Sequence, residues 1–155
     1  MVPDRIEREI LIDAPLDVVW AVVTEPEHVS GWFSDSAEID LRPGGGVILT
    51  WEQHAERWWV ERVEPPHFVS FRWLRAVQGD TDVEPREGNS TLVEFSLTAE
   101  EEGTRLRVVE SGFSRLAGSE EENAKDAEEH RRGWELELDE LREYVSTLAR
   151  GPARR

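Results

Sequence analysis

Residues 55–74, AERWWVERVEPPHFVSFRWL, place two runs of alternating apolar and charged residues on either side of a Pro-Pro pair. Alternation with a period of two is typical of strands that bury one face. Because proline has no backbone N–H to donate to a central ladder, Pro65 and Pro66 end the first run. The stretch therefore predicts two consecutive strands, over residues 56–63 and 67–75, joined by a short turn.

The same stretch holds three of the seven tryptophans in the chain. Successive side chains of a strand point to opposite faces, so Trp58 and Trp59 cannot both face one interior. One of them is expected on the inner face, and the other on the outer surface or in a contact between two copies of a homodimer. Core packing is the plain interpretation of these indoles, but they also suit the wall of a partly wet cavity, because each keeps an N–H for water or ligand. A cavity must be hydrated, filled or collapsed, since an empty one is costly.

Outward from this stretch, the N-terminal segment predicts one strand followed by two short helices. Residues 5–12 alternate as a half-buried strand, and Pro15 suits the first position of a helix. Thr24 and Glu27 have the spacing of a capping box for a second helix, which Gly31 would close.

Strand patterns then continue to the last helix. Residues 35–53 and 90–110 each alternate about a turn, and residues 76–89 predict a long polar loop. Ser119 and Glu122 form another capping box, ahead of an apolar stripe spaced for a long helix. The order is strand, two short helices, six strands in meander order and a long helix. It predicts an α+β fold with an antiparallel sheet.

Length and charge narrow the range of functions. At 155 residues the chain predicts one domain, over residues 1–150, with a disordered tail at 151–155. Its formal charge of −16 opposes nucleic acid and anionic membranes, so neither is an expected partner. No long apolar run or signal-like N-terminus occurs, which predicts a cytoplasmic protein. The absence of cysteine excludes disulfides and thiolate ligands.

Catalytic motifs are sparse. The four histidines are scattered without metal-ligand spacing, so no metal site is expected, and the glycines at 44–46 precede a strand and indicate a turn. We find no nucleotide fingerprint and expect no cofactor. Glu110 continues the inward alternation of Leu106 and Val108, which would aim a carboxylate into an apolar interior where its pKa could rise.

The alternative for Glu110 is that the alternation slips at the end of the strand. Its carboxylate is then solvated or pairs with Arg72 or Arg107. His130 and Trp134 lie one helical turn apart, so His130 is a candidate proton-transfer partner for Glu110.

Several stretches together carry a resemblance to a known family: EREILIDAPLDVVWAVVTEPEHVSGWFSD, RPGGGVILTW, VERVEPPHFVSFRW, TRLRVVESGF and GWELELDELREYV. In this order they resemble the heat-shock-protein-90 ATPase activator homologue family of the START-like, or SRPBCC, superfamily. The resemblance implies a helix-grip fold, in which a curved seven-stranded antiparallel sheet surrounds the C-terminal helix and a hydrophobic cavity lies between them. By that resemblance the cavity wall includes Trp20, Trp32, Phe33, Trp51, Phe71, Trp73, Phe95, Phe113, Trp134 and Leu138.

Three functions follow as hypotheses. The first is a carrier or binding domain for a small apolar or aromatic ligand, oriented by Glu110. The second is a START-like enzyme of the cyclase, dehydratase or hydrolase type that uses the cavity carboxylate. The third is a regulatory or chaperone-linked module that acts through the acidic surface. The eukaryotic activators carry a further N-terminal domain that this sequence does not show, so stimulation of a chaperone is not expected.

Overall fold

The computed structural model describes residues 2–75, 85–86 and 88–150 of the chain. The predicted tail at 151–155 and most of the predicted loop at 76–89 lie outside the described residues. The elements follow one another as β1 (Arg5–Ile12), α1 (Leu16–Thr24), α2 (Pro26–Trp32), β2 (Ser36–Ile39), β3 (Gly46–Thr50), β4 (Ala55–Glu64), β5 (Phe68–Leu74), β6 (Ser90–Glu100), β7 (Gly103–Ser111), the short helix η1 (Phe113–Arg115) and α3 (Glu120–Arg150).

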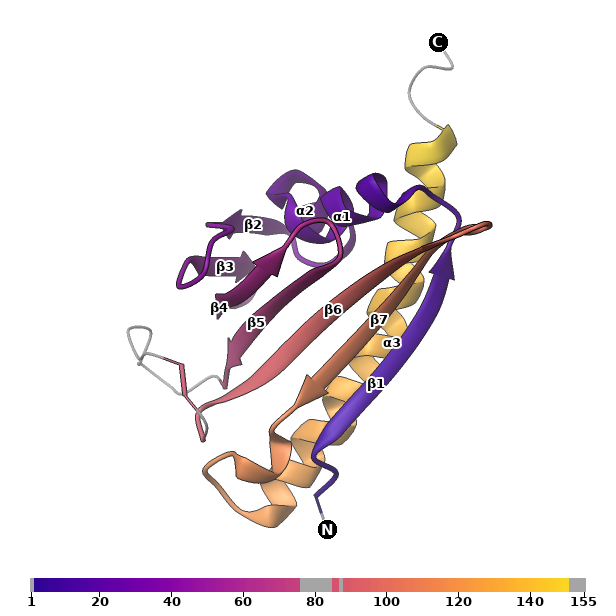
Figure 1. Cartoon of the computed structure of the whole chain (residues 1–155). Coiled ribbons are helices and arrows are strands. Elements are labelled where there is room, and N and C mark those ends of the chain that lie inside the picture. Colours follow the sequence, from indigo (N-terminus) through magenta and orange to yellow (C-terminus); the bar gives the residue numbers. More distant parts are fainter. Residues whose placement is uncertain (1, 76–84, 87, 151–155) are drawn as a thin grey trace.

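The seven strands form one antiparallel sheet in the order β1-β7-β6-β5-β4-β3-β2. Consecutive strands from β2 to β7 are neighbours, and β1 adds itself to β7 at one edge. Figure 1 shows α3 running behind β1, β6 and β7, while α1 and α2 lie at the β2 end of the sheet. The predicted α+β, helix-grip architecture is confirmed, including the two short helices after the first strand.

The decisive hairpin pairs Trp58 of β4 with Trp73 of β5. Trp58 is buried with only 3% of its surface exposed, and it faces α3 within the main core. Trp59 takes the other face, where the Arg57 guanidinium lies 5.0 Å from the centre of its ring. The structure thus decides which of the two indoles the interior receives.

The second predicted capping box is present and the first is wrong. At the start of α3 the Glu122 N–H donates to Ser119 Oγ, and the Ser119 N–H donates to Glu122 Oε1, both at 3.0 Å. Thr24 instead ends α1, where its hydroxyl donates to the Trp20 carbonyl at 2.7 Å. Proline disfavours helical dihedrals in the residue before it, and Glu25, which precedes the first residue of α2, is extended and takes the N-cap position.

Gly31 does not close α2 as predicted, because the helix continues through it to Trp32. The glycine is needed for packing instead. A β-carbon at this position would lie 2.4 Å from Cε1 of Tyr144, so only a hydrogen atom leaves room for the α3 side chain to cross α2.

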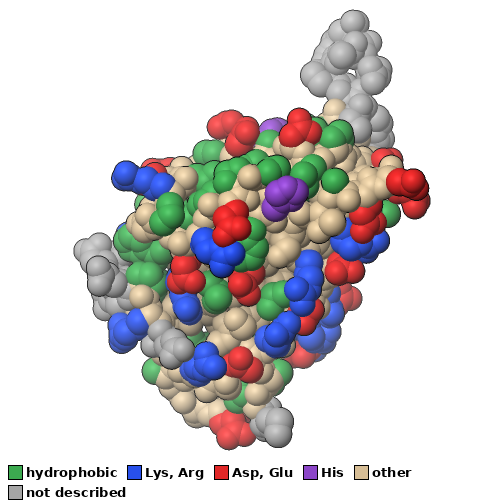
Figure 2. Space-filling view, in the orientation of Figure 1, with side chains coloured by type: hydrophobic (Ala, Val, Ile, Leu, Met, Phe, Trp, Pro, Cys, Tyr) green, Lys and Arg blue, Asp and Glu red, His purple; other side chains and the backbone are tan. Residues whose placement is uncertain are grey.

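The outer face of the sheet carries charges of both signs over β1, β6 and β7, where acidic and basic side chains are mixed (Figure 2). Arg107 donates to Glu7 across the β1–β7 pair, and Arg105 donates to Glu100 at 2.7 Å. These exposed pairs contribute little to stability, but they keep this face wet and leave the opposite face to form the core. No helix of the described residues is long and apolar enough to span a membrane.

Candidate functional site

Aromatic side chains converge between the sheet and α3, as the resemblance implied. They surround a cavity of about 30 Å³, which is room for roughly one water. Ring contacts close the remaining space: Phe33 stacks on Trp134 with centroids 6.0 Å apart, and Phe95 meets Trp134 edge to face at 5.7 Å. Among the described residues, packing therefore replaces the ligand-sized internal cavity that the resemblance implied.

Ligand-sized space lies instead along the border between the sheet and α3. One cleft, which we call the aromatic cleft, has a volume of about 300 Å³ and is lined by Phe33, Trp51, His54, Glu56, Trp73, Glu129, His130, Gly133, Trp134 and Glu137. A second, which we call the polar cleft, has a volume of about 540 Å³ and is lined by Ala55, Glu56, Arg57, Trp73, Leu74, Arg75, Thr91, Phe113, Leu116, Glu122, Lys125, Asp126, Glu129 and His130. Four residues belong to both linings: Glu56, Trp73, Glu129 and His130.

Glu110 anchors the wall that the two clefts share. It lies near the end of β7, where the alternation does not slip, and its side chain is fully buried. Its Oε2 accepts hydrogen bonds from Thr91 Oγ1 at 2.6 Å and from His130 Nδ1 at 2.8 Å. Its Oε1 accepts from Trp134 Nε1 at 2.8 Å. Three donors from β6 and α3 thus satisfy the buried acid, and neither of the arginines weighed from the sequence is its partner.

His130 lies between the buried Glu110 carboxylate and the two open clefts. Its ring stacks on Trp73 with centroids 4.2 Å apart and meets Phe113 edge to face at 5.4 Å. Burial acts to lower the pKa of His130, but the hydrogen bond and charge of Glu110, together with Asp126 and Glu56, raise it above the ordinary value. A histidine whose Nδ1 is held by a carboxylate has a fixed tautomer and can exchange protons through its other nitrogen.

Two further acids on the cleft wall have raised pKa values. Glu56 points inward from β4, and burial raises its pKa against opposing contacts from Trp58 and His54. Glu137 of α3 has its pKa raised to about 7, first by burial and then by the charges of Glu140 and Glu56. A cleft that holds acids of raised pKa beside a histidine is typical of a binding or catalytic site.

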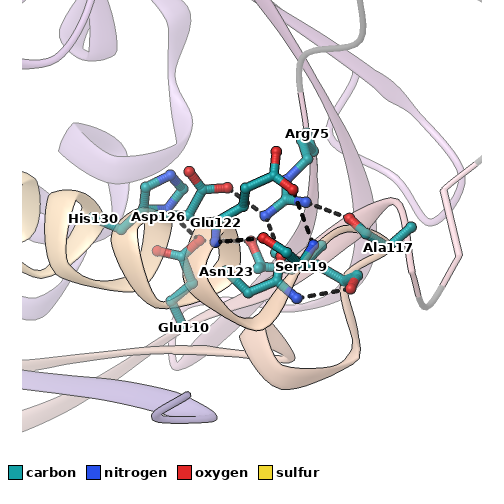
Figure 3. A network of polar contacts seen from close by, with 10 residues as sticks. Arg75, Glu110, Ala117, Ser119, Glu122, Asn123, Asp126 and His130 are labelled. Atoms are coloured by element: carbon teal, nitrogen blue, oxygen red, sulfur yellow. Dashed lines mark hydrogen bonds and ion pairs between the residues drawn. The ribbon is translucent and has the colours of Figure 1, made fainter. Parts of the chain in front are cut away.

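The first turns of α3 are tied to the sheet by Arg75, which follows β5. Its guanidinium donates to the Ala117 carbonyl at 2.5 Å, to Asn123 Oδ1 at 2.8 Å, and to Asp126. Figure 3 shows this network beside the pair formed by Glu110 and His130. Asp126 lies one helical turn before His130. The network therefore fixes the position of His130 along the helix axis relative to the sheet.

The predicted wall residues fall into three groups. Trp32, Phe33, Phe71, Phe95 and Trp134 surround the small cavity. Trp51, Trp73 and Phe113 line the clefts, where Phe33 and Trp134 also contribute. Trp20 and Leu138 pack in or against the core and line none of these spaces. The structure does bring Glu110 and His130 together.

Sequence reasoning missed several residues of the site. Glu56 shares the inward parity of Trp58, and that signal could have identified it. Thr91 pairs with Trp73 across β5 and β6, and no local pattern indicates its bond to Glu110. No group of three or more side chains suited to a metal ion occurs among the residues that the structure describes.

Comparisons with known proteins place the fold in a family. The profile described as "Activator of Hsp90 ATPase homolog 1-like protein" matches residues 13–146. The Bacillus halodurans protein BH1534 is 28% identical, with a TM-score of 0.70 over 93% of this chain and 97% of its own. CalU16 from Micromonospora echinospora is also 28% identical, with a TM-score of 0.68 over 96% of this chain and 66% of its own.

A more distant neighbour shares only the fold. The Aha1 dimer of Colwellia psychrerythraea is 18% identical, with a TM-score of 0.67 over 92% of this chain and 91% of its own. A search of curated proteins gives no significant match.

Proposed function

The chain belongs to the family of activator of Hsp90 ATPase homolog 1-like proteins, and from that premise we propose that it binds a small aromatic or apolar ligand in the aromatic cleft. The family and its fold support a ligand-binding or polyketide-cyclase-like domain in general. The finer assignment rests on the cleft itself.

The proposal rests on one observation. A cleft of ligand size, walled by indoles, lies beside Glu110, a buried carboxylate that accepts three hydrogen bonds. Trp51, Trp73 and Trp134 offer rigid apolar surface in a volume of about 300 Å³, within the range usual for small-molecule sites. Glu110 holds His130 and Trp134 in place, so the wall is organised before a ligand arrives. Preorganisation of this kind lowers the entropic cost of binding.

The test is calorimetric titration with a panel of neutral one- to three-ring aromatic compounds. We expect at least one to bind and to raise the melting temperature. Trp73→Leu should weaken that binding by about tenfold or more, because the indole forms one wall of the cleft. Trp59→Leu is the matched control, since it removes an indole from the outer face of the sheet. A panel without binding, or equal loss in the two variants, would contradict the proposal.

Acid-base catalysis is the second candidate, and the hydrogen bond of 2.8 Å between Glu110 and His130 favours it. In such a reaction His130 would accept or donate a proton in the cleft while Glu110 stabilises the imidazolium. If a bound compound is converted, His130→Phe should retain binding and lose turnover. Undiminished turnover in that variant would remove His130 from any mechanism.

A homodimer also remains a proposal. The dimeric Colwellia neighbour supports it at the level of the shared fold. Light scattering coupled to gel filtration should give twice the chain mass of 17.8 kDa, and a monomer mass at high micromolar concentration would count against it.

A further inference from the structure

The charges around the aromatic cleft are unbalanced. Glu56 of β4 and both Glu129 and Glu137 of α3 line it. No lysine or arginine belongs to its lining among the described residues. The adjoining polar cleft is lined by three basic side chains, Arg57, Arg75 and Lys125. Arg75 is occupied by its bonds with Asn123 and Asp126.

The two histidines of the cleft do not restore the balance. His130 is paired with Glu110, so its positive charge is met by a buried carboxylate behind it. His54 stacks on Trp51 and lies 3.4 Å from Glu56. When Glu110 is counted with the three acids of the lining, four carboxyl groups stand against these two imidazoles.

One buried polar atom on this wall, and another in the core, make no hydrogen bond among the described residues. These atoms are Glu56 Oε1 and Trp58 Nε1. Trp58 itself is 3% exposed. The Trp58 indole lies close enough to lower the pKa of Glu56 as a hydrogen-bond donor, but the two groups do not reach the geometry of a full hydrogen bond. An unpaired buried acceptor is costly, and a donor from a ligand in the cleft would relieve that cost.

We propose that the ligand of the aromatic cleft carries a positively charged nitrogen, so that the natural class is an aromatic or apolar amine. This inference rests on the proposed function and narrows its ligand class. The faces of Trp51 and Trp73 attract a cation through their ring quadrupoles. Glu56 and Glu137, which approach from the sheet and from α3, supply the opposing charge and accept N–H bonds.

The acids predict how such binding depends on pH. Glu137, with a pKa of about 7, is largely neutral at pH 6 and largely ionised at pH 8. A primary ammonium stays charged over this range, because its pKa is near the ~10.4 of lysine. Loss of the proton from His130 acts in the same direction, since it removes a positive charge. Affinity for an ammonium should therefore rise with pH, while affinity for a neutral analogue should change little.

The experiment compares three probes of one shape by calorimetry: phenethylamine, 2-phenylethanol and phenylacetate. At pH 8 we expect the amine to bind about tenfold more tightly than the alcohol. The carboxylate should bind least. The preference for the amine should shrink at pH 6.

Variants distinguish an effect of the cleft acids on binding from an effect of the protein's overall charge. Glu56→Gln and Glu137→Gln should each reduce the amine preference and leave the alcohol's affinity unchanged, and Glu137→Gln should also flatten the pH dependence. Glu143→Gln removes the same charge from an exposed position of α3 and should change neither. Equal binding of amine and alcohol, or equal effects of Glu143→Gln and Glu137→Gln, would overturn the cation inference and leave the proposed function standing. Absence of binding by all three probes and by the neutral aromatic panel would overturn both.

Discussion

Replacing Glu110 with glutamine should uncouple His130 from its charge partner without changing the shape of the site. Glutamine has one acceptor oxygen where glutamate has two. The carbonyl can serve Trp134 while the amide NH₂ faces Thr91 and His130. A hydroxyl and a neutral imidazole can both accept a hydrogen bond, so the network can re-form with the proton of His130 on Nε2. The variant is thus expected to fold.

The magnitude of the effect depends on pH. In the wild-type protein the pKa of His130 is raised, so its pairing stabilises the fold fully below the unfolded value of ~6.5 and is lost as pH rises through the folded value. Glu110→Gln removes that charge-assisted hydrogen bond, worth about 1.5 to 3 kcal/mol. Burial then acts on His130 with less opposition and moves its pKa downward. The cost should be large near pH ~5.5 and small near pH ~9.

The assay is urea unfolding of both proteins at the two pH values, followed by tryptophan fluorescence. An NMR titration of the imidazole nitrogens gives the pKa of His130 directly. Glu128→Gln is a control, because that exposed acid of α3 pairs with Arg131 and Arg132 and lies outside the site. A pH-independent difference in unfolding free energy, together with an unchanged pKa of His130, would refute the reasoning.

Three further substitutions test the packing and ends of the helices by thermal and urea unfolding. Gly31→Ala should destabilise by about 1 to 3 kcal/mol, because its β-carbon must displace the ring of Tyr144. Gly133→Ala meets nothing within 4 Å and should stabilise α3 by up to ~1 kcal/mol; a loss there would contradict the open space. Ser119→Ala removes the cap of Glu122 and should cost about 1 kcal/mol, whereas an unchanged melting temperature would contradict the cap.

Much of the fold was predictable because its signals are local. The alternation of residues 56–63 predicts both the strand and which of its side chains face the core. The spacing of Ser119 and Glu122 marks the start of α3. The box at Thr24 failed for an equally local reason, since the proline at position 26 moved the cap by one residue. Gly31 failed because its neighbour Tyr144 is remote in the sequence.

The site was only partly predictable. The end of β7 allowed Glu110 to face inward or outward, and pairing with β6 and α3 decided it. The volume between the rings could not be predicted, because residue types give a lining but not the distances between its members. The rings of Phe33 and Trp134 stack closely enough to fill the space in which the resemblance implied a cavity.

The position of β1 has a consequence for how the chain reaches this structure. Every other neighbouring pair of strands is consecutive in the sequence, but β1 aligns Ile12 with Thr104 of β7. Loop closure over so long a stretch carries a larger entropic cost than any hairpin of the meander. β1, which precedes the other strands of the sheet in the sequence, is therefore expected to pair last. Until β7 has been synthesised, β1 has no strand to pair with. Its apolar face therefore stays open to non-native contacts in the nascent chain.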